Sequence, residues 1–190
     1  MQRCPWSQNH PLLEEYHDRE WGTAIHDDRK HFEFFVMDLF QAGLSWLTIL
    51  KKREGFRNAF DGFDFRKIAM YDEEKIHELL SDEKIIRNKL KIRATINNAQ
   101  KFLEIIDEYG SFDAYIWKFT DGRTIHNSWT DEKELPASTE LSDRVSMDLK
   151  ERGLKFVGST IIYAYMQAAG MVNDHTVDCF RYAELHSMNE

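Results

Sequence analysis

Both cysteines of this 190-residue chain lie near its ends, each with a histidine in a nearby motif. Cys4 and His17 belong to RCPW and EYHDREW, and His175 and Cys179 are four residues apart in VNDHTVDCFRY. On a helix such a pair shares one face and can bind one ion. A closed Cys2His2 set leaves no position for a reactive water, as in structural zinc sites. Spacing alone, however, favours two inert cysteines and two ordinary histidines, because such residues are common in proteins.

A carboxylate lies within an almost wholly apolar segment. Asp38 is part of FVMDLFQAGLSW, residues 35–46, which follows two further aromatic positions, Phe32 and Phe34. A helix that is apolar on all sides is normally buried, and a buried carboxylate is costly unless a partner or a ligand uses it. The helix pattern by itself favours an ion pair with Arg53, Arg57 or another basic neighbour. Ligand binding is the alternative.

The charge of the chain is unevenly distributed. A net charge of −8 argues mildly against a dedicated nucleic-acid binder. Three basic clusters nevertheless stand out, at Leu50–Arg57, Lys84–Lys101 and Arg144–Lys155. Each one alone is best explained as a solvated helix face. Together they make a phosphate-facing side plausible.

The composition is that of an ordinary globular protein, with 42% hydrophobic and 31% charged residues. No apolar run reaches the roughly 18 residues of a membrane-spanning helix, and the first residues lack the apolar stretch of a signal peptide. We therefore expect a cytoplasmic protein without membrane contact, whose cysteines stay reduced. No coiled-coil pattern or long apolar edge is evident, so we expect a monomer.

Helical spacing recurs along the chain, and few segments alternate as strands do. The sequence predicts one all-α domain over residues 1–190, with one extended loop from Thr120 to Ala137. A long helical segment is expected from Lys84 to Tyr109. Helix starts are expected at Asp27 or Asp28, Asp72, Ser111, and Ser138 or Thr139.

A short glycine-containing turn separates two helical segments near residues 140–170. Gly153 can end the first helix, and Gly158 followed by Ser159 can start the second. Free backbone N–H groups at a helix start suit a phosphate, and Lys155 lies beside them. The pattern resembles the helix-hairpin-helix motif of DNA repair proteins, although glycines between helices are also routine.

Several motifs together are specific to one family. The runs RCPW, YHDREWG, QAGLSWLTILKKRE, IIRNKLKI and RGLKFVGSTIIYAYMQAAGMVNDH cover almost the whole chain, which is similar to the type I 3-methyladenine DNA glycosylases. This resemblance implies an all-α helix-hairpin-helix bundle that excises 3-methyladenine from alkylated double-stranded DNA without lyase activity. It also implies one structural zinc ion, a clasp of the chain ends held by Cys4, His17, His175 and Cys179.

The resemblance assigns roles to residues around the expected base pocket. The base-contacting carboxylate corresponds to Asp38. The stacking rings correspond to Tyr16 and Trp46, with Trp6 and Trp21 around the pocket. The loop that approaches the gap in the DNA corresponds to Gln41, Gly43 and Leu44.

The sequence departs from the family pattern at two positions. Asp38 replaces a glutamate, so the carboxylate is one methylene shorter, and a smaller pocket or a bridging water must compensate. Leu13 replaces an aromatic residue and forfeits a ring contact, on the order of 1 kcal/mol. Membership of the family survives both changes, while the preference among lesions stays open.

The expected chemistry depends on the charge of the lesion. N3-methylation leaves adenine positively charged, so a desolvated carboxylate favours it over normal adenine, and aromatic faces attract the cation. Two other functions remain as alternatives. One is a helix-hairpin-helix protein that binds damaged DNA without cleaving it. The other is a metal-dependent phosphohydrolase, suggested by the HD and NDH dyads but disfavoured by the cysteines.

Overall fold

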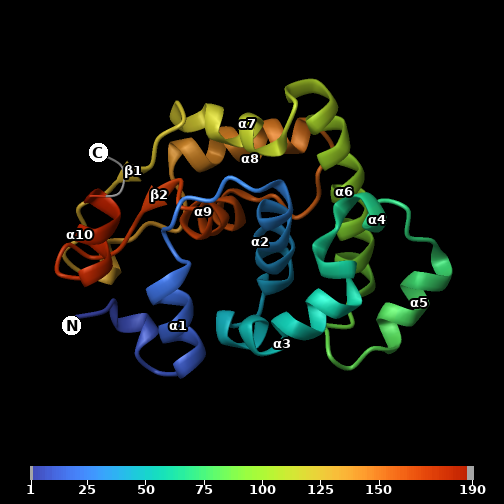
Figure 1. The fold of residues 1–190 in the computed structure, drawn as a ribbon, viewed down its shortest axis with the longest axis horizontal. Helices are drawn as coiled ribbons and strands as arrows, with labels where there is room; N and C mark the ends of the chain where they lie inside the picture. Colours follow the sequence, from blue (N-terminus) through green and yellow to red (C-terminus); the bar gives the residue numbers. More distant parts are fainter. Residues whose placement is uncertain (1, 188–190) are drawn as a thin grey trace.

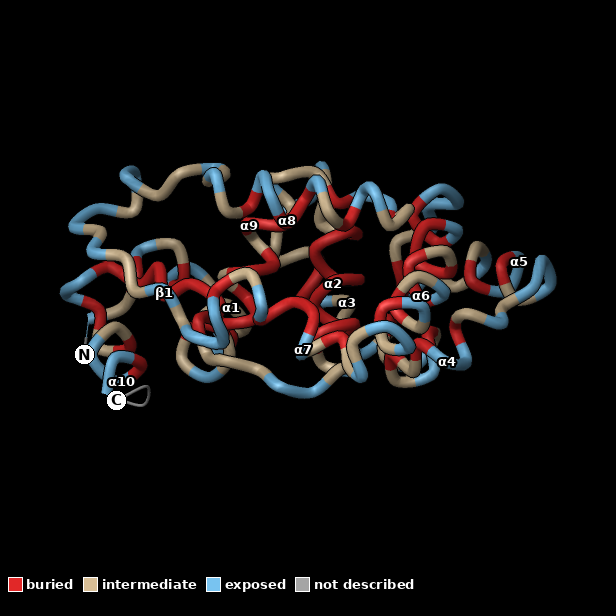
Figure 2. Tube along the Cα trace, turned by 90° about the horizontal axis from the view of Figure 1, so that it is seen from above, coloured by how far each residue is buried: buried red, intermediate tan, exposed pale blue. Residues whose placement is uncertain are grey.

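The structure is a computed structural model that describes residues 2–187. Helix α2 (Asp28–Gln41) lies at its centre, and Figure 1 shows the other helices arranged around it. Every residue from His31 to Phe40 is buried, as expected for a helix that is apolar on nearly all sides. The buried part of the trace is concentrated around this helix (Figure 2). Helix α2 is therefore the central core element.

The remaining helices pack on α2 or on its neighbours, which confirms the all-α prediction. Those in direct contact with α2 are α3 (Trp46–Ala59), α6 (Lys89–Tyr109), α7 (Phe112–Trp117) and α9 (Ser159–Ala168). Of the others, α1 (Pro11–Arg19) packs on α3, and α8 (Glu140–Glu151) packs on α9. Helices α4 (Phe65–Ile68) and α5 (Glu73–Ser81) both pack on α6. Helix α10 (Phe180–Ser187) ends the described chain.

The segment expected as an extended loop has more structure than the sequence indicated. Strand β1 (Ile125–His126) pairs in parallel with β2 (Val172–Asn173). A 3-10 turn, η4 (Glu132–Glu134), begins with a capping box at Asp131. Two-residue strands are too short for an alternating pattern to reveal them. Three other 3-10 turns are η1 (Pro5–Ser7), η2 (Asp61–Phe63) and η3 (Lys118–Thr120).

Most helix boundaries follow the expected caps. The side chains of Asp27, Asp72 and Ser111 each accept a hydrogen bond from a backbone N–H in the first turn. Thr139, rather than Ser138, caps α8. The long helix begins at Lys89 and not at Lys84, because the Asn88 side chain accepts from the Lys91 N–H and starts it there.

One buried polar network connects three helices through the core. The His31 ring, which is 0% exposed, contacts the Asp113 carboxylate through Nε2 at 3.0 Å and the Tyr165 hydroxyl through Nδ1 at 2.6 Å. It links α2, α7 and α9 in a cluster that is otherwise apolar. Between residues 2 and 187, no helix has both the length and the apolar character needed to cross a membrane.

Candidate functional site

The four residues at the chain ends converge. The ligand atoms of Cys4, His17, His175 and Cys179 lie within 4.8 Å of one another, and all four side chains are buried. The Cys179 sulfur is 3.4 Å from His17 Nε2 and 3.5 Å from His175 Nδ1. The two ring nitrogens are 3.2 Å apart. Tetrahedral zinc, with bonds of about 2.3 Å to sulfur and 2.05 Å to nitrogen, separates such atoms by about 3.5 Å and 3.3 Å. The cluster therefore has the dimensions of a metal site.

Neighbouring groups orient both imidazoles toward the centre of this cluster. His17 Nδ1 is 2.8 Å from the Asp18 carboxylate, which Arg3 holds from the other side. His175 Nε2 is 3.0 Å from the Trp21 carbonyl oxygen. Each ring can thus donate one N–H outward, which leaves its other nitrogen unprotonated and facing the cluster.

The expectation that His175 and Cys179 share a helix face was wrong. Residues 174–179 form turns between β2 and α10, which begins at Phe180. The Cys179 N–H donates to the Thr176 carbonyl, which closes a turn and brings the sulfur to the imidazole. Pairing of β2 with β1 fixes the start of this turn.

The dyads that suggested a phosphohydrolase do not form an open site of oxygen and nitrogen ligands. Asp18 contacts Arg3 and His17. Asp174 accepts four side-chain hydrogen bonds, from Asn127, Trp129, Tyr163 and Gln167. Two sulfurs and two nitrogens would fill all four positions of a tetrahedral ion and would leave none for a substrate.

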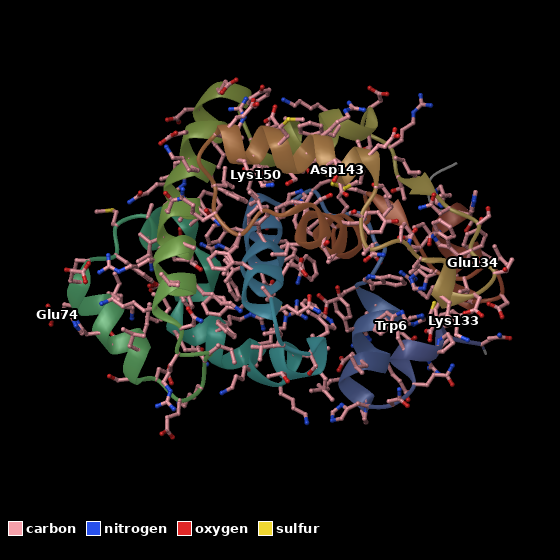
Figure 3. All side chains as sticks on the ribbon, turned by 180° about the vertical axis from the view of Figure 1, so that it is seen from behind. Trp6, Glu74, Lys133, Glu134, Asp143 and Lys150 are labelled. Atoms are coloured by element: carbon pink, nitrogen blue, oxygen red, sulfur yellow. The ribbon has the colours of Figure 1, made fainter. Side chains whose placement is uncertain are left out.

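A cavity of about 230 Å³ opens next to the Cys2His2 cluster, since Trp21 lines the cavity and contacts His175. The centroids of the Tyr16 and Trp46 rings are 5.1 Å apart, with 54° between their planes. Trp6 and Trp21 meet edge to face at 5.1 Å, and Trp6 lies beside the loop of Lys133 and Glu134 (Figure 3). The residues that line the cavity are Trp6, Tyr16, Trp21, Asp38, Gln41, Trp46, Leu135, Ala164 and Gln167.

Among residues 2–187, Asp38 has no charged partner. Its side chain is 4% exposed and its Oδ2 atom makes no hydrogen bond within residues 2–187. Arg53 instead forms a bidentate pair with Glu20 and a hydrogen bond with Glu33. The expected ion pair between Asp38 and Arg53 is therefore not formed in the described chain.

Arg57 is also engaged elsewhere, with Glu33 and Glu54. Burial therefore acts on Asp38 without compensation and raises the pKa of its carboxyl group well above the ordinary value. A group of this kind, in a cavity wall, is a candidate for ligand binding.

Three cavity residues were not identified from the sequence: Leu135, Ala164 and Gln167. Leu135 comes from the segment expected as a loop. Ala164 and Gln167 are three residues apart on α9 and share one face. The Asp174 carboxylate accepts from Gln167 Nε2 at 2.8 Å, so the amide oxygen of Gln167 points away from it. Spacing on α9 indicated a shared face but not which side of the helix meets the cavity.

The segment between α2 and α3 lies at the mouth of the cavity. Gln41 lines the cavity, and Gly43 and Leu44 follow it at the surface, where Leu44 is 39% exposed. Gly43 has a φ of +81°, a left-handed conformation that favours glycine. Leu13, by contrast, packs against the core and is not among the cavity residues.

The turn between α8 and α9 is held by α6. The Asn98 side chain accepts from the Lys155 N–H at 2.8 Å and donates to its carbonyl oxygen at 2.9 Å. Gly158 is the N-cap residue of α9 and has no side chain that could accept a hydrogen bond. The first backbone N–H groups of α9 therefore have no side-chain cap. Ser159 Oγ is 2.7 Å from Ser142 Oγ of α8. The Lys155 side chain is exposed and makes no ion pair within the described chain.

Most arginines of the three basic clusters are paired with acidic residues. Arg93 bonds both oxygens of Glu73, and Arg152 bonds Glu108 and Asp148. The solvated-face explanation therefore fits most residues of these clusters, whereas the Lys91 side chain is buried. A larger depression beside Tyr16 is likewise lined mainly by charged side chains, and the ion pairs of Arg53 occupy part of it.

Comparisons with known proteins agree with this geometry. The profile described as "Methyladenine glycosylase" matches residues 6–182. The chain is 44% identical to DNA-3-methyladenine glycosylase 1 of Escherichia coli (strain K12), covering 96% of this chain and 97% of that protein. It is 40% identical to DNA-3-methyladenine glycosylase of Haemophilus influenzae, covering 93% and 96%.

A solved structure of a 3-methyladenine DNA glycosylase I variant in complex with 3-methyladenine superposes with a TM-score of 0.91. It shares 31% sequence identity and covers 95% of this chain and 97% of its own. Since the profile and the relatives both span nearly the full length, the chain belongs to the methyladenine glycosylase family.

Proposed function

We propose that the protein is a base-excision repair enzyme that hydrolyses the N-glycosidic bond of 3-methyladenine in alkylated double-stranded DNA, without a lyase step. The observation that carries the proposal is Asp38, a buried carboxyl group with no charged partner in an aromatic cavity. The names of the relatives, and the relative solved with 3-methyladenine, support this substrate.

The cavity residues divide the task of holding an extruded base. Tyr16 and Trp46 offer ring faces for stacking. Asp38 accepts from the exocyclic amine. Because burial disfavours its charged form, a ligand that brings positive charge and N–H donors lowers the cost of ionisation. Normal adenine has the exocyclic amine but no positive charge, so it gains less binding free energy from Asp38.

Little acid catalysis is needed, because the methylated base leaves as a neutral molecule. The cavity holds the departing base, and the phosphates of the DNA stabilise the sugar cation until water completes the hydrolysis. Leu13 does not line the cavity. We therefore expect the shorter carboxylate of Asp38, rather than Leu13, to determine the preference among lesions.

Two surfaces are proposed to hold the duplex. Gln41, Gly43 and Leu44 face the gap that the extruded base leaves, since they lie at the mouth of the cavity and Leu44 is exposed. The start of α9, at Gly158 and Ser159, binds a phosphate beside Lys155. Its support is the absence of a side-chain cap on α9.

We further propose that the metal ion is zinc, since two thiolates and two imidazoles in a closed tetrahedron suit that ion. It has a structural role and joins the two ends of a single domain. The enzyme is proposed to act as a cytoplasmic monomer.

The decisive experiment is incubation with methylated duplex DNA, followed by chromatography of the released bases. We expect free 3-methyladenine and little 7-methylguanine. Asp38→Asn should slow release about 10- to 100-fold, from the roughly 1.5–3 kcal/mol of a hydrogen bond to a charged group. Asp107→Asn, an exposed position on α6, is the control. Wild-type protein that binds methylated DNA but releases no base would instead be a non-catalytic binder of damaged DNA.

A further inference from the structure

The segment from Gln41 to Ser45 is short and has little support of its own. The Leu44 N–H donates to the Gln41 carbonyl at 2.6 Å. Ser45 caps α3 through the Thr48 N–H. A Cβ atom added at Gly43 would meet no atom within 4 Å, so no packing restrains that position. The shape of the segment must therefore be set where it leaves α2.

The side chain of Lys91, on α6, reaches the C-terminal end of α2. This side chain is buried, with 7% exposed, and its Nζ donates to the Phe40 carbonyl at 2.9 Å and to the Ala42 carbonyl at 2.6 Å. These two carbonyls lie on either side of Gln41. The last carbonyls of a helix have no partner within the helix, and a cation is favourable at that end of the helix dipole.

We propose that Lys91 is a positioning residue, which fixes residues 41–44 in the shape that engages duplex DNA. The inference rests on the proposed function, because it takes the duplex as the partner of this segment. Lys91 itself is not among the residues that line the base cavity. Its effect reaches the DNA only through the backbone on both sides of Gln41.

A buried lysine near a glycosylase cavity also raises the alternative of an amine nucleophile. The contacts of Lys91 argue against it. Both of its partners are carbonyl oxygens, which only accept hydrogen bonds, so its N–H groups point at the α2 terminus. Burial lowers the pKa of Lys91 from its ordinary value, and the two carbonyls oppose that effect by stabilising the ammonium form.

The test separates duplex engagement from base binding. Lys91→Met removes the donors at similar length, and Lys91→Gln retains an amide N–H2 and provides a milder change. Lys75→Met on α5, where the lysine pairs with Glu78, is the control. Two equilibrium affinities are measured, for free 3-methyladenine and for a duplex that contains a non-cleavable abasic analogue. Melting temperature reports folding.

For Lys91→Met we expect duplex affinity to fall about 10-fold or more, because a small displacement of a positioning segment is costly. Affinity for free 3-methyladenine should fall by less than duplex affinity, because Gln41 lines the base cavity but Gly43 and Leu44 do not. Lys91→Gln should lose less duplex affinity, and Lys75→Met none. Unchanged duplex affinity in both Lys91 variants would overturn the proposal, as would an equal loss of both affinities.

A double variant tests the route of the effect. Gly43→Ala strains the same segment, because its φ of +81° suits glycine. If Lys91 acts through this segment, Lys91→Met adds little to the duplex affinity already lost in Gly43→Ala, whereas multiplied losses would show independent action and refute the route. Failure of the proposed function is distinct, because there the wild-type protein releases no base from methylated DNA.

Discussion

Asp38 shows that the requirements of folding and of binding differ at a single residue. Folding buries its carboxyl group beside aromatic rings without a compensating charge. The result is a group whose ionisation costs free energy in the folded protein, as the raised pKa of Asp38 reflects. Such destabilised groups persist where function uses them.

Asp38→Asn should remove the loss of stability with rising pH that Asp38 itself causes. Below about pH 4 the carboxyl group is neutral in both the folded and the unfolded chain. At higher pH the unfolded chain ionises while the raised pKa keeps Asp38 protonated in the folded state, so the wild type loses stability as pH rises toward that pKa. Asparagine does not titrate. The free energy of unfolding of the variant, relative to wild type, should therefore increase from pH 4 to pH 8.

Urea unfolding of both proteins at pH 4, 6 and 8 measures this difference. The constant cost of an uncompensated asparagine amide cancels, since only the change with pH is compared. Asp107→Asn, at an exposed position of α6, is the control. Parallel pH profiles for wild type and Asp38→Asn would contradict the uncompensated burial of Asp38.

At the scale of elements, α9 connects the two parts of the proposed DNA site. Its first residue, Ser159, lies at the α8–α9 turn, and Gln167 near its end lines the base cavity. Asn98 holds the turn from α6, and Asp174 holds Gln167 from the turn after β2. The distance between phosphate contact and base contact is thus set by one rigid helix.

Lys155→Ala should weaken binding to duplexes regardless of their sequence. If Lys155 neutralises one phosphate, the slope of log affinity against log salt should become shallower by about 1. The affinity for free 3-methyladenine should not change, because Lys155 does not line the cavity. Titrations of an abasic-analogue duplex at several salt concentrations measure the slope, with Lys75→Ala as the control. A slope identical to wild type would place the phosphate contact elsewhere.

At the scale of the whole molecule, the Cys2His2 cluster joins segments that are 171 residues apart, as the contact between Cys4 and His175 shows. The same segments carry cavity walls, since Trp21 lines the cavity and its carbonyl contacts His175. Loss of the metal would therefore loosen the cavity together with the chain ends.

Cys179→Ser should release the metal and destabilise the fold. Structural zinc contributes folding free energy through its binding. A loss of only 3 kcal/mol would lower the melting temperature of a chain of this size by about 6–12 °C. Elemental analysis and calorimetry measure the two effects, with His77→Gln at an exposed position of α5 as the control. Equal metal content and melting temperature in Cys179→Ser and wild type would refute the clasp.

The sequence alone determined features that depend on near neighbours in the chain. Helix starts at Asp27, Asp72 and Ser111 follow from side chains that bond the next turn of backbone. The burial of the α2 segment follows from its uniformly apolar residues. Residue types, with the resemblance to a known family, also identified the Cys2His2 set and most cavity residues.

Tertiary structure decided which groups meet through space. Arg53 pairs with Glu20, and the Asp38 Oδ2 atom has no hydrogen-bond partner within residues 2–187. The tertiary structure brought His175 and Cys179 together by a turn rather than by a helix. It also placed Gln167 in the cavity and Lys91 at the end of α2. Such contacts depend on how distant elements pack, and local spacing carries no information about that packing.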